Sequence, residues 1–161
     1  MSVHYLLNID GIEGESKNSQ YPNHIEVKQF SWGATQSGTF AVNSGGGAGK
    51  VTMQDFHFTM SVNKASVKLM KACASGEHIK SATLYCLKAG KDQQTFLTVT
   101  FTDLLVSSYQ AGGSDGGDFL PDDSITLNFA CINMQYKEQK ADGTMGGAIQ
   151  GGYNLKLNKS I

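Results

Sequence analysis

The feature that most constrains this chain is an alternation of apolar and polar residues with a period of two. In residues 3–10, apolar Val3, Tyr5, Leu7 and Ile9 are separated mostly by polar residues. Side chains of a β-strand point to opposite faces in turn, so this pattern predicts a strand with one buried face. Patterns of this kind give seven or eight strands, within the segments 3–10, 24–33, 34–42, 51–62, 81–89, 94–108, 123–139 and 151–159.

Within residues 24–33 the apolar positions change register. Ile25 and Val27 come first, and Phe30 and Trp32 then take over the apolar face. A shift of one residue is what a β-bulge produces, so we expect a bulge between the two pairs. If Phe30 and Trp32 point into the core, Ser31 points to the other side of the sheet.

One segment, residues 63–76, has the pattern of an amphipathic helix. Asn63 or Ser66 is suited to cap its start, and Gly76 stands where a left-handed C-cap belongs. We expect the helix to lie on a sheet through its apolar side chains. One face carries Val67, Met70 and Ala74, with Leu69 and Cys73 beside it.

Two strands, within residues 96–106 and 125–136, are apolar on both faces. In residues 125–136, one face carries Ile125, Leu127, Phe129 and Cys131, and the other carries Ala130, Ile132, Met134 and Tyr136. A strand that is apolar on both faces is buried on both, and one short helix cannot cover every second face. We therefore expect a subunit interface that includes Phe96, Leu104, Ile132, Met134 and Tyr136.

The number of strands favours a closed sheet, because closure removes the edges that would otherwise pair with other chains. The predicted fold is mainly β: a β-barrel of two packed sheets with one flanking α-helix. A length of 161 residues fits one domain, and no linker, charge run or internal repeat divides residues 1–161.

Composition excludes several classes of function. The net charge of −1 gives no electrostatic basis for binding nucleic acid or an anionic membrane. We expect no signal peptide, because the first residues have no basic segment followed by an apolar stretch, and no apolar run in the sequence is long enough to span a membrane. Cys73, Cys86 and Cys131 are odd in number and irregularly spaced. We expect reduced, buried thiols in a protein made in the cytoplasm.

The segment SGGGAGKVT, residues 44–52, resembles a phosphate-binding loop only at first sight. That motif needs Gly six residues before Lys50 and Ser or Thr directly after it, but the chain has Ser44 and Val51 there. A strand rather than a helix is predicted to follow Lys50, so no helix N-terminus would face a phosphate. Glycine here favours flexibility and close approach of the backbone.

No catalytic or metal-binding pattern stands out among the remaining residues. Asp55 and His57 share one face of a strand, which is compatible with a catalytic pair but more typical of a local hydrogen bond. Cys73 and His78 are a weaker nucleophile–base candidate, because Cys73 belongs to the apolar helix. The four histidines show no metal-ligand spacing, so we expect neither metal nor cofactor.

Eight short segments, in order along the whole chain, carry a resemblance to a known family. They are GESK 14–17, SWG 31–33, GGGAGK 45–50, QDFHFT 54–59, LMKACASGEH 69–78, LVSSYQAGGS 105–114, LNFACINMQY 127–136 and QKADGTMGG 139–147. On these the chain resembles the Hcp family (haemolysin-coregulated protein), the tube subunit of the bacterial type VI secretion system. Tyr153 is a conservative departure, since many members have Trp there.

The resemblance implies a barrel similar to phage tail-tube proteins and a non-enzymatic, structural role. Hexameric rings would stack into a tube inside a contractile sheath, below a VgrG-type spike. The tube would leave the cytoplasm on contraction, with small effector proteins in its lumen. The alternative from the residues alone is a small soluble enzyme or nucleotide-binding protein that uses the Gly49–Lys50 loop or the Asp55/His57 pair.

Two predictions about ring surfaces follow. In a ring of barrels, the side to which Ser31 points is either the channel wall or the outer rim. A glycine-rich loop is costly to order, so a contact between rings would have to offset that cost. We expect a ring-stacking loop made of Gly45, Gly46, Gly47, Ala48, Gly49 and Lys50.

Overall fold

The computed structural model describes residues 2–38, 50–90, 92–117 and 119–161. The fold is mainly β, as predicted, with eleven strands and one helix among these residues. Their bounds are β1 Val3–Ile9, β2 Ile25–Val27, β3 Gln29–Ser31, β4 Ala34–Gln36, β5 Val51–Met53, β6 Phe56–Ser61, α1 Ala65–Ser75, β7 Ile79–Lys88, β8 Thr95–Gly112, β9 Asp122–Gln139, β10 Met145–Asn154 and β11 Lys159–Ser160.

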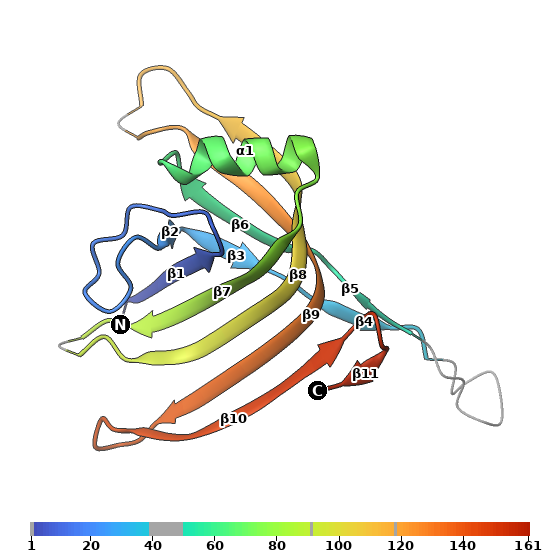
Figure 1. Cartoon of the computed structure of the whole chain (residues 1–161). Coiled ribbons are helices and arrows are strands. Elements are labelled where there is room, and N and C mark those ends of the chain that lie inside the picture. The colour runs from blue at the N-terminus through green and yellow to red at the C-terminus, as the bar shows by residue number, and fades with distance from the viewer. Residues whose placement is uncertain (1, 39–49, 91, 118) are drawn as a thin grey trace.

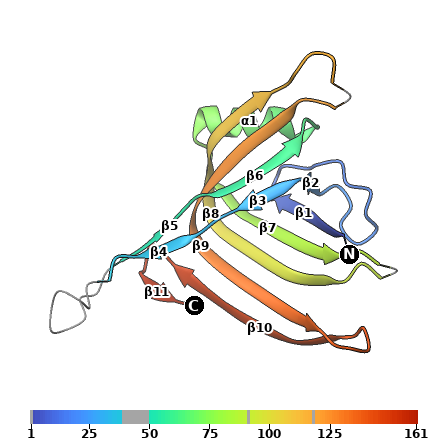
Figure 2. The ribbon, with the colours of Figure 1, turned by 180° about the vertical axis from the view of Figure 1, so that it is seen from behind.

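Nine strands form one antiparallel sheet that is built around β9 (Figure 1). One side of β9 pairs with β8, and the other side is shared by two strands. Residues 122–127 of β9 pair with β6, whereas residues 131–139 pair with β10. The sheet therefore divides along β9 into a β6–β3 branch and a β10–β11 branch. In Figures 1 and 2, the separate β4–β5 hairpin extends away from this body.

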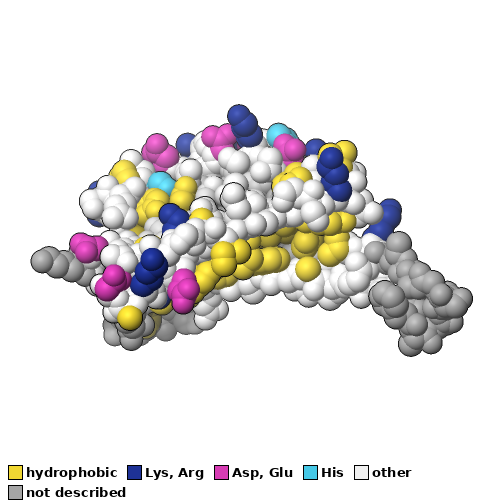
Figure 3. Space-filling view, turned by 90° about the horizontal axis from the view of Figure 1, so that it is seen from below, with side chains coloured by type: hydrophobic (Ala, Val, Ile, Leu, Met, Phe, Trp, Pro, Cys, Tyr) yellow, Lys and Arg dark blue, Asp and Glu magenta, His cyan; other side chains and the backbone are white. Residues whose placement is uncertain are grey.

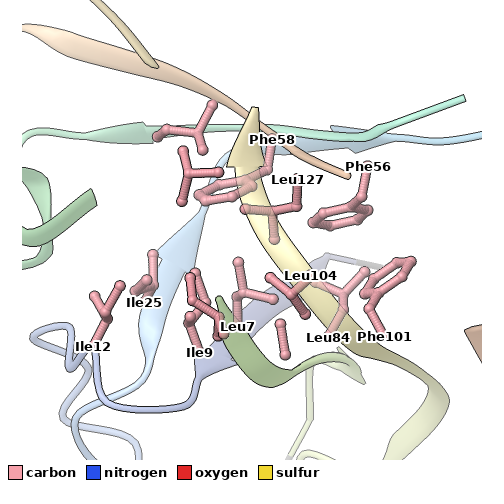
Figure 4. Packing of buried hydrophobic residues seen from close by; sticks show 14 of the residues in the cluster. Leu7, Ile9, Ile12, Ile25, Phe56, Phe58, Leu84, Phe101, Leu104 and Leu127 are labelled. Carbon is pink, nitrogen blue, oxygen red and sulfur yellow. The ribbon is translucent and has the colours of Figure 1, made fainter. Parts of the chain in front are cut away.

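The hydrophobic core lies between the β6 branch and the β1–β7 part of the sheet (Figure 4). Strand β6 follows the period-two pattern without exception: Phe56, Phe58 and Met60 are fully buried, and the residues between them are partly exposed. Phe101 of β8 packs on Phe56 with a ring separation of 4.7 Å. Such rings bury large apolar areas, the main stabilising contribution in a domain of this size.

The expected closed barrel is not formed by the described strands, and this prediction was wrong. The sheet wraps around the core, but its strand order ends at β2 on one side and β11 on the other. At the predicted bulge, β2 ends and β3 begins two residues later. The N–H of Lys28 donates to the carbonyl of Thr59, so the chain leaves β1 here and pairs with β6. One short segment thus divides its pairing between two strands.

A sharp bend crosses the sheet and explains the strands that are apolar on both faces. Three residues that pair side by side, Ile79, Leu104 and Phe129, are buried together. Three positions away along each strand, a second buried row consists of Ala82, Phe101 and Ile132. Residues three apart in a regular strand face opposite sides. Between the rows, Asp103 has a left-handed backbone with φ 55°, and the strands curve strongly (Figure 1).

This bend corrects part of the predicted subunit interface. Leu104 and Ile132 are 2% and 4% exposed and belong to the core of their own chain. Their side chains therefore cannot supply much surface to a partner. The sequence prediction failed because it assumed that one strand keeps one face throughout its length.

Helix α1 has the predicted ends. The side chain of Asn63 accepts from the N–H of Ala65 at 2.8 Å, and Ser66 Oγ accepts from the N–H of Asn63 at 3.0 Å. Gly76 closes the helix in a left-handed conformation with φ 68°, its N–H donating to the carbonyl of Ala72. The reciprocal bonds of Asn63 and Ser66 at the N-terminus satisfy backbone N–H groups that have no partner inside the helix.

The buried face of α1 differs from the one that its apolar pattern suggests. Leu69 and Ala72 are buried, whereas Val67 and Met70 are 62% and 46% exposed. A polar contact fixes this orientation: Ser66 Oγ donates to Asp123 Oδ2 at 2.6 Å, and both residues are buried. Turning the helix toward Val67 and Met70 would break this bond and leave a buried carboxylate without its donor.

Candidate functional surfaces

The outer side of the β6 branch carries a row of polar side chains. Ser31, His57, Thr126 and Ser108 lie directly beside one another across four paired strands. They alternate with the core residues, so their own side of the sheet faces away from the core. We call this surface the polar face: Ser31, Asp55, His57, Ser107, Ser108, Ser124, Thr126 and Asn128. Ser31 is exposed and points away from the core, as predicted.

Hydrogen bonds connect most of the polar face. Asp55 accepts from Ser107 Oγ at 2.6 Å and from Asn128 Nδ2 at 2.9 Å. Thr126 Oγ1 lies 2.7 Å from Ser107 Oγ and 2.5 Å from Ser108 Oγ. Such a surface offers many donors and acceptors in a fixed arrangement. The sequence analysis missed Ser107, Ser108, Ser124, Thr126 and Asn128. The polar residues that alternate with core residues in β9 were the available signal.

The Asp55/His57 pair proposed from sequence does not act as a unit. His57 Nε2 lies 2.7 Å from Ser124 Oγ, while Asp55 bonds to Ser107 and Asn128 instead. A catalytic serine needs a base that is itself oriented by a third group. Among the described residues, no carboxylate bonds to the His57 ring. This geometry supports a hydrogen-bonding surface more than a reaction centre.

The other candidate groups from the sequence also stay apart. Cys73 is half-buried on α1, and exposed His78 contacts Asp103 rather than Cys73, at 3.0 Å. The hydrogen bond from His78, followed by contacts with Lys156, lowers the pKa of the Asp103 carboxyl below its ordinary value. No group of three or more metal-ligating side chains occurs within the described ranges of the chain. The described helix is not long and apolar enough to cross a membrane.

Most of the predicted stacking loop lies outside the described residues, namely Gly45 to Gly49. Lys50 is described and exposed, and it directly precedes β5. The prediction that a strand follows Lys50 is therefore confirmed, and the helix that a phosphate-binding loop requires is not there. The loop connects the two strands of the projecting β4–β5 hairpin.

A cavity of about 670 Å³ lies beside β1 and β2. Its walls include Glu15, Lys17, Glu26 and Lys28, so carboxylates and ammonium groups are mixed. None of Asp55, His57, Cys73 and His78 lines it. The cavity therefore does not gather the candidate catalytic groups in one place.

An uncovered apolar surface lies on β9 and β10. Met134 and Tyr136 continue the face of Ile132 past the core, and Ile149 pairs directly with Tyr136. We call Met134, Tyr136 and Ile149 the apolar face; they are 40%, 43% and 74% exposed. From below, where β10 is the lowest strand of the large sheet, a band of hydrophobic side chains crosses the molecule (Figure 3). Phe96, the remaining predicted interface residue, is half-buried beside the core.

Known proteins share both the sequence and this architecture. Residues 6–136 match the family described as "Type VI secretion system effector, Hcp". The chain is 42% identical over 160 residues to Protein hcp1 of Pseudomonas aeruginosa, with 98% of each chain covered. It is also similar to a solved type six secretion system protein at TM-score 0.94 and 30% identity, covering 99% of this chain and 100% of that one. The chain is likewise similar to the solved structure of Hcp1 from Salmonella typhimurium, at TM-score 0.84 and 36% identity, over 100% of both chains. The chain therefore belongs to the Hcp family of type VI secretion system proteins.

Proposed function

We propose that this protein is the structural subunit of a type VI secretion tail tube. Six copies form a ring, and rings stack into a tube that is exported through a contractile sheath below a VgrG-type spike. The observation that carries the proposal is the apolar face of β9 and β10. Exposed apolar patches of this kind mark protein–protein contacts, and a ring covers one such patch on every copy.

Mass in solution tests the assembly directly. Light scattering of the unmodified chain at micromolar concentration is expected to give a particle six times the 17.3 kDa of one chain. Tyr136→Asp is expected to reduce that mass, because a charge placed in a buried apolar contact is costly. The matched control is Gln135→Asp, which makes the same change of one negative charge on the neighbouring residue of the strand, outside the apolar face. A stable monomer of the unmodified chain would contradict the proposal.

The second part of the proposal is that the polar face lines the ring lumen and holds small effector proteins. Its fixed hydroxyl, carboxylate and imidazole groups offer hydrogen bonds to varied polar cargo without a deep pocket. The open position is Ser31, which is exposed at the β3 side of the face. A bulky side chain there would narrow the lumen and cover its neighbours.

Ser31→Gln is the test of the lumen. We expect less co-purification of a small effector with rings of unchanged mass. Ser160→Gln makes the same substitution at an exposed serine on β11, outside the polar face, and is expected to leave cargo binding intact. Equal cargo binding by both variants would place Ser31 on the outer rim.

A further inference from the structure

The hairpin between β8 and β9 ends in two exposed apolar side chains. Phe119 is 86% exposed and Leu120 is 64% exposed, the largest exposed pair of neighbours among the described residues. We call the described residues 113–117 and 119–121 the hairpin tip. Leaving a phenylalanine in water forfeits the stabilisation that its burial provides, so such a group is typical of a docking element.

The base of the hairpin tip is fixed to the body of the molecule. The carbonyl of Pro121 accepts from the N–H of Val62 at 2.9 Å, and Asp122 forms an ion pair with Lys28 at 2.7 Å. The next residue, Asp123, is held to α1 by Ser66. Three anchors from separate segments, at Lys28, Val62 and Ser66, thus hold the base, so less ordering is needed when the tip meets a partner.

Gly151 has no side chain within the apolar face, and we call the open position that it leaves the notch. Gly151 pairs with Met134 and lies two positions from Ile149, so it belongs to the same side of β10. A Cβ placed on Gly151 would meet no atom within 4 Å. At the neighbouring Gly152, a Cβ would collide with the carbonyl oxygen of Ile132. Glycine is therefore required by the fold at position 152 but not at position 151, where it leaves open space beside apolar side chains.

Charge favours contact between these two surfaces. Between residues 113 and 121 the sequence has Asp115 and Asp118 but no lysine or arginine, and Asp115 is exposed in the tip. Residues 133–161 contain four lysines against Glu138 and Asp142. Opposite net charges guide association and suppress pairing of like surfaces, here tip with tip.

We infer that the hairpin tip of one copy docks on the apolar face of the next copy, with Phe119 in the notch at Gly151. The inference rests on the proposed self-assembly and assigns its contact. In Figures 1 and 2 the hairpin between β8 and β9 lies beside α1, whereas β10 lies at the opposite side of the body. The tip therefore cannot reach the notch of its own chain. A contact between two different surfaces of the same chain is head-to-tail. Copies joined in this way form a closed ring when the rotation from one copy to the next divides a full turn evenly.

A disulfide between copies tests this contact. The background variant replaces the two half-buried cysteines, Cys73→Ser and Cys131→Ser, and keeps buried Cys86. With Phe119→Cys and Gly151→Cys in one chain, mild oxidation is expected to give a ladder of covalent oligomers on a non-reducing gel. Each single variant is expected to give no ladder beyond a dimer. A double variant that forms rings by light scattering but no ladder would overturn the inference and leave the proposed function standing.

A steric test removes the notch. Gly151→Leu is expected to weaken association of the copies by about 30-fold or more, the effect of losing a central aromatic anchor. Ala148→Leu adds the same side chain to an exposed position on the opposite face of β10 and is the matched control. Circular dichroism shows whether each monomer is folded. Equal association of the two variants would overturn the inference.

Discussion

Among single residues, Asp103 has an unusual backbone conformation at the bend of the sheet. Its φ of 55° is in the left-handed region, at the level where three strands change the face that they bury. Aspartate and asparagine tolerate this region far better than branched residues do. The carboxylate also contacts His78 and Lys156 in the same bend.

Asp103→Val is expected to lower the free energy of unfolding by about 1–3 kcal/mol, because valine is strained at positive φ. Asp103→Asn keeps a side chain suited to this conformation and is the matched control. Urea unfolding followed by circular dichroism measures both. A valine variant as stable as the asparagine variant would show that the bend does not need the left-handed residue.

Cys86 provides a second prediction at this scale. Burial raises the pKa of its thiol to about 12 from the ordinary 9.0, so the reactive thiolate is scarce at pH 8. We expect a thiol reagent to leave Cys86 unmodified in the folded protein and to modify it after denaturation. Cys86→Ser is the control that identifies the signal. Rapid modification of Cys86 in the native protein would contradict its placement in the core.

The raised pKa of Cys86 also makes the stability of the folded protein depend on pH. The folded protein holds the Cys86 proton more tightly than the unfolded chain does. The resulting stabilisation is therefore complete below about pH 9 and is lost as the pH rises toward 12. Unfolding measured across this range is expected to show a smaller decline in stability for Cys86→Ala, once the cost of the substitution itself is subtracted.

At the scale of elements, α1 shows how tertiary packing selects one face of a helix. Its apolar residues occupy more than one face, and the pattern alone favoured the face of Val67 and Met70. The Ser66–Asp123 hydrogen bond and the shape of the sheet place Leu69 and Ala72 inside instead. Burial near Asp123 also raises the pKa of the Tyr109 phenol, the Asp123 carboxylate adding to the shift.

Two alanine variants one residue apart separate these faces. Leu69→Ala is expected to destabilise the folded chain by about 2–5 kcal/mol, since it removes a fully buried side chain. Met70→Ala is expected to stay within about 0.5 kcal/mol, because Met70 is exposed and alanine is a better helix former. Thermal or urea unfolding measures the difference, on protein diluted until it is monomeric. Similar losses for both would mean that the helix is turned differently.

At the scale of the whole molecule, the described strands wrap the core without closing, and a two-stranded hairpin extends from the body (Figures 1 and 2). The strand edges at β2 and β11 and the apolar face of β9 and β10 are surfaces that a single copy does not cover. In the proposed ring, neighbouring copies would supply the cover that strand closure would otherwise supply. The glycine loop at the end of the β4–β5 hairpin is our candidate for contact between successive rings.

Deleting Gly45 to Ala48 tests that candidate. We expect rings of unchanged mass that no longer grow into tubes or leave the cell, because the ring contacts lie elsewhere. Electron microscopy counts tubes, light scattering gives the ring mass, and secretion is read in the culture medium. A length-preserving control that replaces Gly45 and Gly46 with serine keeps the loop long enough to reach a neighbour. Normal tubes from the deletion would contradict a stacking role.

Features that depend on neighbours along the chain could be predicted from the residues alone. Period-two alternation predicted the strands, capping residues predicted both ends of α1, and the Phe30–Ser31–Trp32 pattern put Ser31 on the outer side. Eight short segments predicted the family, which similarity to Hcp proteins confirms. These signals are local because side-chain direction and end capping are set within a few residues.

Features that depend on strands distant in sequence were visible only in the tertiary structure. It moved Leu104 and Ile132 into the core, left the barrel open, turned α1 toward Asp123, and joined Asp55 to Ser107 and Asn128 rather than to His57. It also placed Gly151 against Met134, where open space lies beside apolar side chains. No local pattern specifies such pairings, because the face that a residue presents changes wherever a strand bends or changes partner.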